Sequence, residues 1–170
     1  ARVGYTLDVT RGDEVWNSSQ VWYMPFDDMD DPVTDEISMW PWREAYYTIN
    51  VCNFILSRTT GDDASLSESM KRIKGQALFL RGYSYYTLAG YYQNPALITD
   101  YANYSSLDGL YGKNSTYDDV LDQVEKDFSE AMTLLPSRDE GGEWAKGRAT
   151  CGAAAGYYAR TLMQRHKYSD

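Results

Sequence analysis

Apolar residues recur at intervals of three and four along four segments of the chain, which is the spacing of one face of an α-helix. We predict helices over about 38–59, 66–92, 117–135 and 149–166. The periodic positions are Trp42, Ala45, Tyr46, Ile49, Cys52 and Leu56 in the first helix, and Val120, Val124, Phe128, Ala131 and Leu135 in the third. The pattern therefore predicts an all-α fold.

The second predicted helix is apolar on two sides, which is typical of a helix packed between two neighbours. One side consists of Met70, Ile73, Ala77, Leu80, Ser84, Leu88 and Tyr91, and the other of Leu78, Phe79, Tyr83 and Tyr86. Aromatic side chains at helical spacing are expected to belong to the core. They are Trp42, Tyr46, Phe79, Tyr83, Tyr86, Tyr157 and Tyr158.

Polar residues and a proline mark the helix starts. Ser65 and Glu68 have the spacing of a capping box, and Thr116 and Asp119 approach it with Asp in place of Glu. Pro41 suits the first turn of the first helix, where a missing N–H costs no hydrogen bond. We therefore expect Ser65 and Thr116 to cap the second and third helices.

Three segments lack a helical period. Residues 1–36 and 93–115 are predicted to be long loops, and residues 137–147 a Gly-rich loop. Loops this long in a compact domain are usually functional or poorly ordered. The acidic cluster from Asp27 to Asp35 has Pro32 where an EF-hand requires Gly, so we expect solvated charges there, with a Ca²⁺ site as the alternative.

A weak internal repeat links the second and fourth helices. Gly82-x₃-Tyr86-x₂-Ala89 resembles Ala154-x₃-Tyr158-x₂-Thr161, and both fit the second helix of a tetratricopeptide unit. The small residues from Ala149 to Gly156 would also let helix axes approach closely. Solenoids need about three units and this chain offers two. Because the chain also starts at Ala1, we expect it to be part of a longer protein.

Charge argues against several classes of partner. The chain has 16 Lys and Arg against 25 Asp and Glu, a net charge of −9. Nucleic-acid binding requires clustered cations, as does a polybasic membrane anchor. No apolar run approaches the roughly 18 residues of a membrane span. The single imidazole, His166, is expected to lie at the surface.

The two cysteines, Cys52 and Cys151, are too few for a Cys₄ zinc site or a disulfide framework. Both lie in apolar helical patterns, which predicts two buried thiols. A single disulfide between them is the alternative.

Four separate blocks make up a recognisable succession. They are Trp42-x₃-Tyr46-x₂-Ile49-x₂-Cys52-Asn53-Phe54-Ile55-Leu56, Gly75-Gln76-Ala77-Leu78-Phe79-Leu80-Arg81-Gly82-Tyr83, Val124-Glu125-Lys126-Asp127-Phe128-x₂-Ala131-x₂-Leu134-Leu135-Pro136 and Gly147-Arg148-Ala149-Thr150-x₂-Ala153-Ala154. Their order and spacing resemble the SusD/RagB family of surface-exposed nutrient-binding lipoproteins of the Bacteroidetes outer membrane. Gln76 and Gly82 replace the family's usual Glu and Ala, so the ligand need not be that of a familiar member.

The resemblance implies a longer, mostly α-helical protein whose tetratricopeptide-like helix pairs form a scaffold. It implies an outer-membrane, surface-exposed lipoprotein held by a lipid anchor that this chain does not include. It also implies capture of an oligosaccharide, or of a peptide in the RagB branch, and delivery to a SusC-like TonB-dependent transporter. Family members are binders rather than enzymes, so we expect no catalytic residue and no cofactor.

The first loop holds side chains suited to sugar binding, where aromatic faces pack on C–H surfaces and polar groups bind hydroxyls. The candidates are Asp13, Trp16, Asn17, Trp22 and Tyr23. We therefore predict that residues 1–36 contribute to the ligand face and that residues 37–170 form the SusD-like helical scaffold. Alternatively, the two tryptophans fill gaps against the rest of a longer protein.

The remaining candidates have plainer interpretations. Arg81 and Arg148 are expected to be structural, reaching carboxylates or helix C-termini. Tyr101, Tyr104 and Tyr111 either contact a ligand or partner or are loop aromatics without a function.

Two other functions compete with glycan or peptide capture. A tetratricopeptide module that binds a protein partner would have short turns, and the long loops argue against it. A glycosidase needs two carboxylates, and no motif among the 25 acidic residues singles out such a pair.

Overall fold

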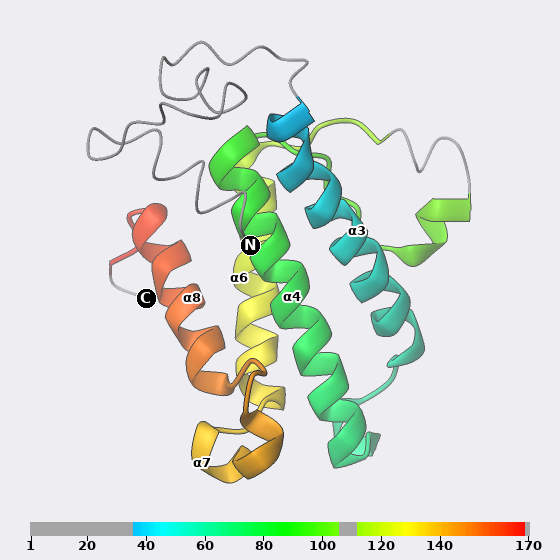
Figure 1. Cartoon of the computed structure of the whole chain (residues 1–170), viewed down its shortest axis with the longest axis vertical. Helices are drawn as coiled ribbons and strands as arrows, with labels where there is room; N and C mark the ends of the chain where they lie inside the picture. Colours follow the sequence, from blue (N-terminus) through cyan, green and yellow to red (C-terminus); the bar gives the residue numbers. More distant parts are fainter. Residues whose placement is uncertain (1–35, 106–111, 169–170) are drawn as a thin grey trace, which may run out of the picture. The chain divides into compact units, whose positions relative to one another are not determined.

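The computed structural model describes residues 36–105 and 112–168. In these ranges the chain forms helices and no strand, which confirms the all-α prediction. The four predicted helices are present, close to their expected bounds (Figure 1). The elements are α3 (Glu36–Arg58), η1 (Asp63–Ser65), α4 (Glu68–Tyr92), η2 (Tyr101–Ser105), α6 (Tyr117–Leu134), α7 (Arg138–Gly141), η3 (Gly142–Ala145) and α8 (Cys151–Gln164).

Helix α3 begins earlier than its apolar pattern indicated. It starts at Glu36, so Pro41 lies inside the helix and the prediction of a first-turn position was wrong. Proline has no N–H to donate to the carbonyl of the preceding turn, so one hydrogen bond of the helix is missing there. Among the described residues, 36–45 belong to one compact unit and those from Tyr46 onward to another.

The caps of α4 and α6 test the predicted start signals. Thr116 caps α6 as predicted, its hydroxyl accepting from the Asp119 N–H at 3.2 Å. The cap of α4 is Ser67 rather than Ser65, and its hydroxyl accepts from the Met70 N–H at 3.3 Å. Ser65 was the wrong choice because it ends η1, where its hydroxyl donates to the Asp62 carbonyl.

The segment predicted as a Gly-rich loop contains two short helices, α7 and η3. Ser137 and Glu140 form a capping box at the start of α7, with N–H to side-chain oxygen distances of 3.2 and 3.1 Å. The loop prediction was therefore wrong for this stretch. The Ser-x-x-Glu spacing that starts α7 is visible in the sequence.

Helix α6 packs against both α4 and α8. Its predicted apolar stripe is buried from Val120 to Leu135, as expected. The small residues of the internal repeat lie at these contacts, since Gly82 abuts Phe128 and Ala154 is buried beside Ala131. The run from Ala149 to Gly156 is only partly used for close approach, because Gly152, Ala155 and Gly156 are exposed.

The predicted aromatic core is smaller than expected. Tyr85 and Phe128 are fully buried, whereas Tyr83 is exposed and the other aromatics predicted to be core are half-buried. Tyr157 stacks on Phe128 with ring centroids 5.6 Å apart, and the edges of Phe79, Tyr83 and Tyr86 surround it. Tyr83 was placed wrongly because it lies at the outer margin of this cluster.

Helix α4 approaches the chain at the end of α6 closely at Gly75. A Cβ at this position would lie 2.9 Å from Cγ of Leu135 and 3.2 Å from Cβ of Leu134. Both leucines are buried. Gly90, near the end of the same helix, has nothing within 4 Å of the equivalent point.

We predict that Gly75→Ala lowers the free energy of unfolding by about 1–3 kcal/mol, because the added methyl overpacks the contact with Leu135. The matched change Gly90→Ala is expected to raise it by up to about 1 kcal/mol through helix propensity. Urea denaturation of the full-length protein followed by circular dichroism measures both. Equal effects of the two variants would contradict the close contact.

A buried ion pair joins α4 to α6. Nε and Nη2 of Arg81 donate to the two carboxylate oxygens of Asp127 at 2.8 and 2.7 Å, and both side chains are almost fully buried. Nη1 of Arg81 donates to Oδ1 of Asn53 on α3 at 2.9 Å, and the Gln123 amide donates to Asp127. Burial works to lower the pKa of Arg81, but the hydrogen bonds and charge of Asp127 outweigh it and raise that pKa. The predicted structural role of Arg81 is confirmed.

Removing one partner of this pair leaves a buried charge unpaired. We predict that Asp127→Asn lowers the free energy of unfolding by about 3–5 kcal/mol. Glu143→Gln, which breaks the exposed pair with Lys146, is the matched control and is expected to change it little. Urea denaturation at neutral pH compares the two variants, and a loss at Asp127 as small as at Glu143 would contradict the prediction.

The first part of the predicted loop 93–115 is an extended segment held against the helices. The carbonyl of Ile98 accepts from the Asn53 amide at 2.7 Å and from the Tyr85 hydroxyl at 2.8 Å. The Tyr46 hydroxyl donates to the Ala96 carbonyl at 2.7 Å. Pro95, Ala96 and Ile98 are buried, so this irregular segment belongs to the core.

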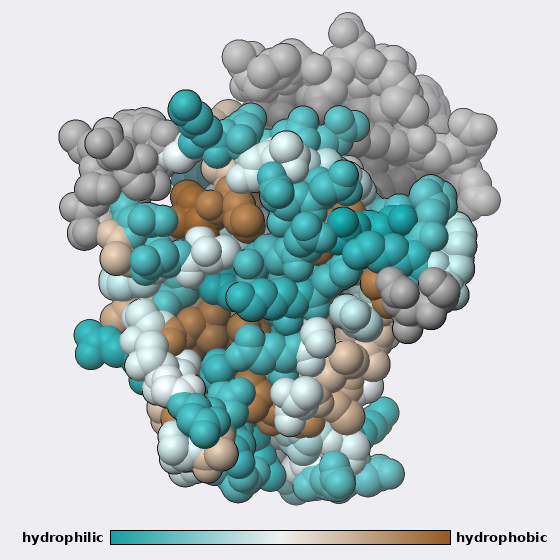
Figure 2. All heavy atoms as spheres, turned by 180° about the vertical axis from the view of Figure 1, so that it is seen from behind, coloured by the Kyte–Doolittle hydropathy of each residue, from teal (hydrophilic) through white to brown (hydrophobic). Residues whose placement is uncertain are grey.

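In the described ranges no helix is both long and apolar enough to cross a membrane. In the view from behind, the surface is largely hydrophilic, and separate patches of hydrophobic residues are exposed among the hydrophilic ones (Figure 2).

Candidate functional site

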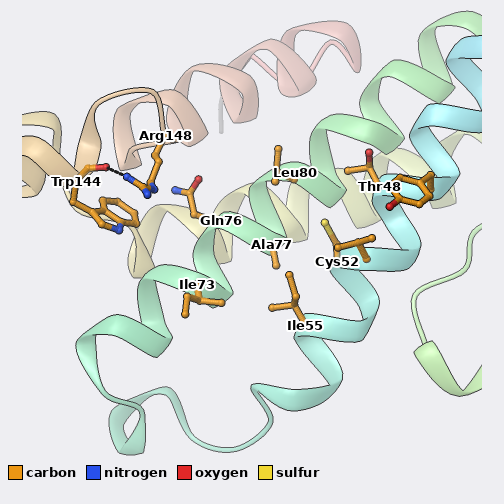
Figure 3. Close-up of a pocket in the computed structure, with 11 residues that line it drawn as sticks. Thr48, Cys52, Ile55, Ile73, Gln76, Ala77, Leu80, Trp144 and Arg148 are labelled. Carbon is orange, nitrogen blue, oxygen red and sulfur yellow. Dashed lines mark hydrogen bonds between the residues drawn. The ribbon is translucent and has the colours of Figure 1, made fainter.

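A groove of about 390 Å³ runs between α3 and α4 and ends at η3. Cys52 and Ile55 of α3 face Ala77 of α4 across it, and Trp144 and Arg148 lie at its far end (Figure 3). The lining residues are Tyr47, Thr48, Val51, Cys52, Ile55, Ile73, Gln76, Ala77, Leu80, Trp144 and Arg148.

Large apolar side chains along this groove remain open to solvent. Tyr47 is 71% exposed and Val51 is 42% exposed on α3, while Ile73 and Leu80 on α4 are 46% and 44% exposed. Ile73 and Leu80 belong to the stripe of the second helix that was predicted to be buried, so that prediction was wrong at these two positions. These two side chains border the groove, whereas Ala77, Ser84 and Leu88 of the same stripe are buried.

Polar groups at the far end of the groove are bound by the chain itself. The Gln76 amide donates to the Ala149 carbonyl at 2.6 Å and accepts from the Ala149 N–H at 3.2 Å. Nη1 of Arg148 donates to the Trp144 carbonyl at 2.8 Å, which confirms its predicted structural role. The guanidinium groups of Arg72 and Arg148 lie 5.1 and 5.3 Å from the Trp144 ring centroid. The indole is therefore engaged by cations.

The lining of the groove is mostly apolar. Its described lining includes no Asp, Glu or His, so it lacks the usual partners for acid–base catalysis. Burial raises the pKa of the Cys52 thiol to about 11, against the opposing charge of Arg81, so the thiol stays protonated at neutral pH. Among the residues that the structure describes, no cluster of three or more His, Cys, Asp or Glu could hold a metal ion.

Both cysteines are free thiols, so the disulfide alternative is wrong. Cys52 is buried as predicted, whereas Cys151 is only half-buried because it opens α8.

We predict that iodoacetamide at about pH 8 modifies Cys151 and spares Cys52, since a thiol with a pKa of about 11 is thiolate in roughly one molecule in a thousand at that pH. Peptide-level mass spectrometry of the native full-length protein measures each site. Cys151→Ser should leave Cys52 unmodified, and unfolding in urea should expose both sites. Equal rates at the two native cysteines would contradict the burial of Cys52.

The residues predicted to bind a ligand lie outside the described ranges. They are Asp13, Trp16, Asn17, Trp22 and Tyr23, and the acidic cluster from Asp27 to Asp35 and Tyr111 lie outside them too. Their predicted roles therefore stay predictions. Tyr101 lies on η2, where its ring meets the edge of Phe54 at a centroid distance of 5.2 Å. His166 is exposed, as predicted.

Sequence reasoning missed the groove. The signal that would have found it is the surplus of apolar positions on the second helix, where Ile73 and Leu80 stay exposed although Ala77 and Leu88 of the same stripe are buried.

Comparison with known proteins connects this helical arrangement to a family. A sequence model of the SusD-like family, described as "starch-binding associating with outer membrane", matches residues 4–163. The chain belongs to the SusD-like family. This confirms the resemblance drawn from the four sequence blocks.

Solved structures of SusD-like proteins share the fold. A SusD-like protein from Bacteroides fragilis has a TM-score of 0.81 at 22% identity, over 99% of this chain and 33% of its own. Surface glycan-binding protein A from Bacteroides uniformis has a TM-score of 0.76 at 22% identity, over 95% of this chain and 36% of its own. A laminarin-binding SusD-like protein has a TM-score of 0.72 at 19% identity, over 98% of this chain and 40% of its own.

The SusD-like chain described here thus spans between a third and two fifths of these three structures. A comparison with curated proteins found no match.

Proposed function

We propose that the full-length protein containing this chain is a surface glycan-binding protein that captures oligosaccharides. It delivers them to a SusC-like TonB-dependent transporter in the outer membrane. The observation that carries the proposal is the match of residues 4–163 to a family described as starch-binding and associating with the outer membrane. Two relatives of the same fold, described as laminarin-binding and as a surface glycan-binding protein, support a carbohydrate ligand.

In this function two parts of the chain have different tasks. Residues 1–36 contribute to the ligand face, and residues 37–170 form the scaffold. The described groove supports this division, because its middle is apolar and its polar end is bound by the chain's own groups. Sugar hydroxyls need free donors and acceptors beside an open aromatic face. Those residue types gather at Asp13, Trp16, Asn17, Trp22 and Tyr23.

Binding and release would then require no bond to be made or broken in the ligand. The proposed protein is not an enzyme, and its affinity comes from aromatic rings packing on sugar rings and from hydrogen bonds to hydroxyls. A peptide ligand, as in the RagB branch, is the alternative that the experiment distinguishes.

We predict that the full-length protein is retarded in native gels cast with at least one polysaccharide. Trp16→Ala or Trp22→Ala should weaken the apparent affinity by at least about tenfold, as expected for a ring that packs on a sugar. Trp40→Ala is the matched control, because Trp40 is an exposed tryptophan on α3 outside the proposed ligand residues. Its retardation should equal that of the unmodified protein.

Calorimetry with a peptide pool runs beside the gels. Retardation that survives both tryptophan changes would place the glycan site elsewhere. If no polysaccharide retards the protein and peptides release heat on binding, the ligand is a peptide and the proposal of glycan capture is wrong.

A further inference from the structure

The turn that ends α4 places a glutamine in a backbone conformation that suits glycine. Gln93 follows the last residue of the helix and has φ 60° and ψ −65°. The N–H of Asn94 donates to the Tyr92 carbonyl at 2.7 Å, so the three residues form a tight turn of the strained γ type. A side chain at positive φ crowds its own backbone, whereas glycine adopts this conformation readily.

The fold accounts for this turn but not for the glutamine side chain. Pro95 and Ile98, just beyond the turn, are buried, so the chain has to bend sharply where the helix ends. Pro95 restricts Asn94 to extended backbone, and the bend therefore falls on residue 93. A glycine at this position would make the same turn without strain.

The other positive-φ positions in the described ranges show what normally occupies such a turn. Three are glycines, at positions 61, 142 and 147. The fourth is His166, whose Nδ1 lies 2.7 Å from the Tyr168 hydroxyl, so its side chain makes a contact within the chain. Gln93 is exposed, and its amide has no hydrogen-bond partner among the described residues. A strained residue without an internal contact points to a contact with another molecule.

The surroundings of Gln93 suit a sugar. Asn94 is exposed beside it. The half-buried rings of Tyr91 and Tyr92 lie next along the chain, edge to face with centroids 6.2 Å apart. A carboxamide offers two N–H donors and a carbonyl acceptor, which match the hydroxyls of a sugar ring, and aromatic rings pack on its C–H faces. The end of α4 therefore brings together the groups that recognise a glycan.

We propose that Gln93 is a further ligand-contacting residue, whose amide binds hydroxyl groups of the captured glycan beside Asn94. This rests on the function proposed above and adds a contact to those expected at residues 1–36. The tight turn fixes the backbone of Gln93 before the ligand arrives, which lowers the entropy that binding costs.

Gln93→Gly separates a binding role from a purely structural one. Glycine relieves the strained φ, so the urea midpoint of the full-length protein should rise. The same change removes the amide, so the apparent affinity in gels cast with a retarding polysaccharide should fall about three- to tenfold, as for one or two lost hydrogen bonds. Gln93→Ala removes the amide and keeps the strain, so it should lose affinity without gaining stability.

His166→Gly is the matched control, because it also places glycine at an exposed position with positive φ. Its retardation should equal that of the unmodified protein. Unchanged retardation of either Gln93 variant would overturn this proposal and leave glycan capture standing. If no polysaccharide retards the unmodified protein, both proposals are wrong. If calorimetry then shows peptide binding that Gln93→Gly weakens, the amide contacts a peptide instead.

Discussion

A charged pair buried between helices is the constraint on which the rest of the helical unit depends. Arg81 and Asp127 are both nearly inaccessible to solvent, and each would be costly to leave without the other. Their two parallel hydrogen bonds hold α4 and α6 in one rotational and axial register. Nη1 of Arg81 donates to Asn53, whose amide in turn donates to the Ile98 carbonyl. The Arg81 guanidinium thus links three helices and the segment that follows α4.

The extended segment after α4 shows why that network is needed. An irregular backbone makes no regular series of backbone hydrogen bonds, so its buried carbonyl groups require side-chain donors. The Ile98 carbonyl receives hydrogen bonds from both Asn53 and Tyr85, and the Ala96 carbonyl receives one from Tyr46. These polar side chains lie at positions that a purely apolar core would fill with leucine. The fold therefore devotes part of its helical surface to holding a loop.

The sequence predicted the long helices well, because their apolar period and the cap at Thr116 are local signals. It failed where two helix-start signals compete. Ser65 has Glu68 at the spacing of a capping box, but Ser67, directly before Glu68, is the residue that caps α4. It also failed where burial depends on what lies opposite. Tyr83 and Leu80 follow the same helical period as buried residues, yet both are exposed. Periodicity gives the face of a helix and leaves open whether another element covers that face.

The interior of the helical unit and the groove on its surface differ in the kind of side chain that each contains. Inside, the chain buries Arg81, Asp127 and Asn53, polar groups that only a fixed geometry can accommodate. Outside, it leaves Ile73 and Leu80 exposed, although burying them requires no such geometry. The side chains of Arg81, Asp127 and Asn53 are thus paired within the helical unit, while apolar side chains along the groove stay exposed. The unit therefore sets the register between α4 and α6 with its own residues and leaves part of the apolar surface along the α3–α4 groove exposed.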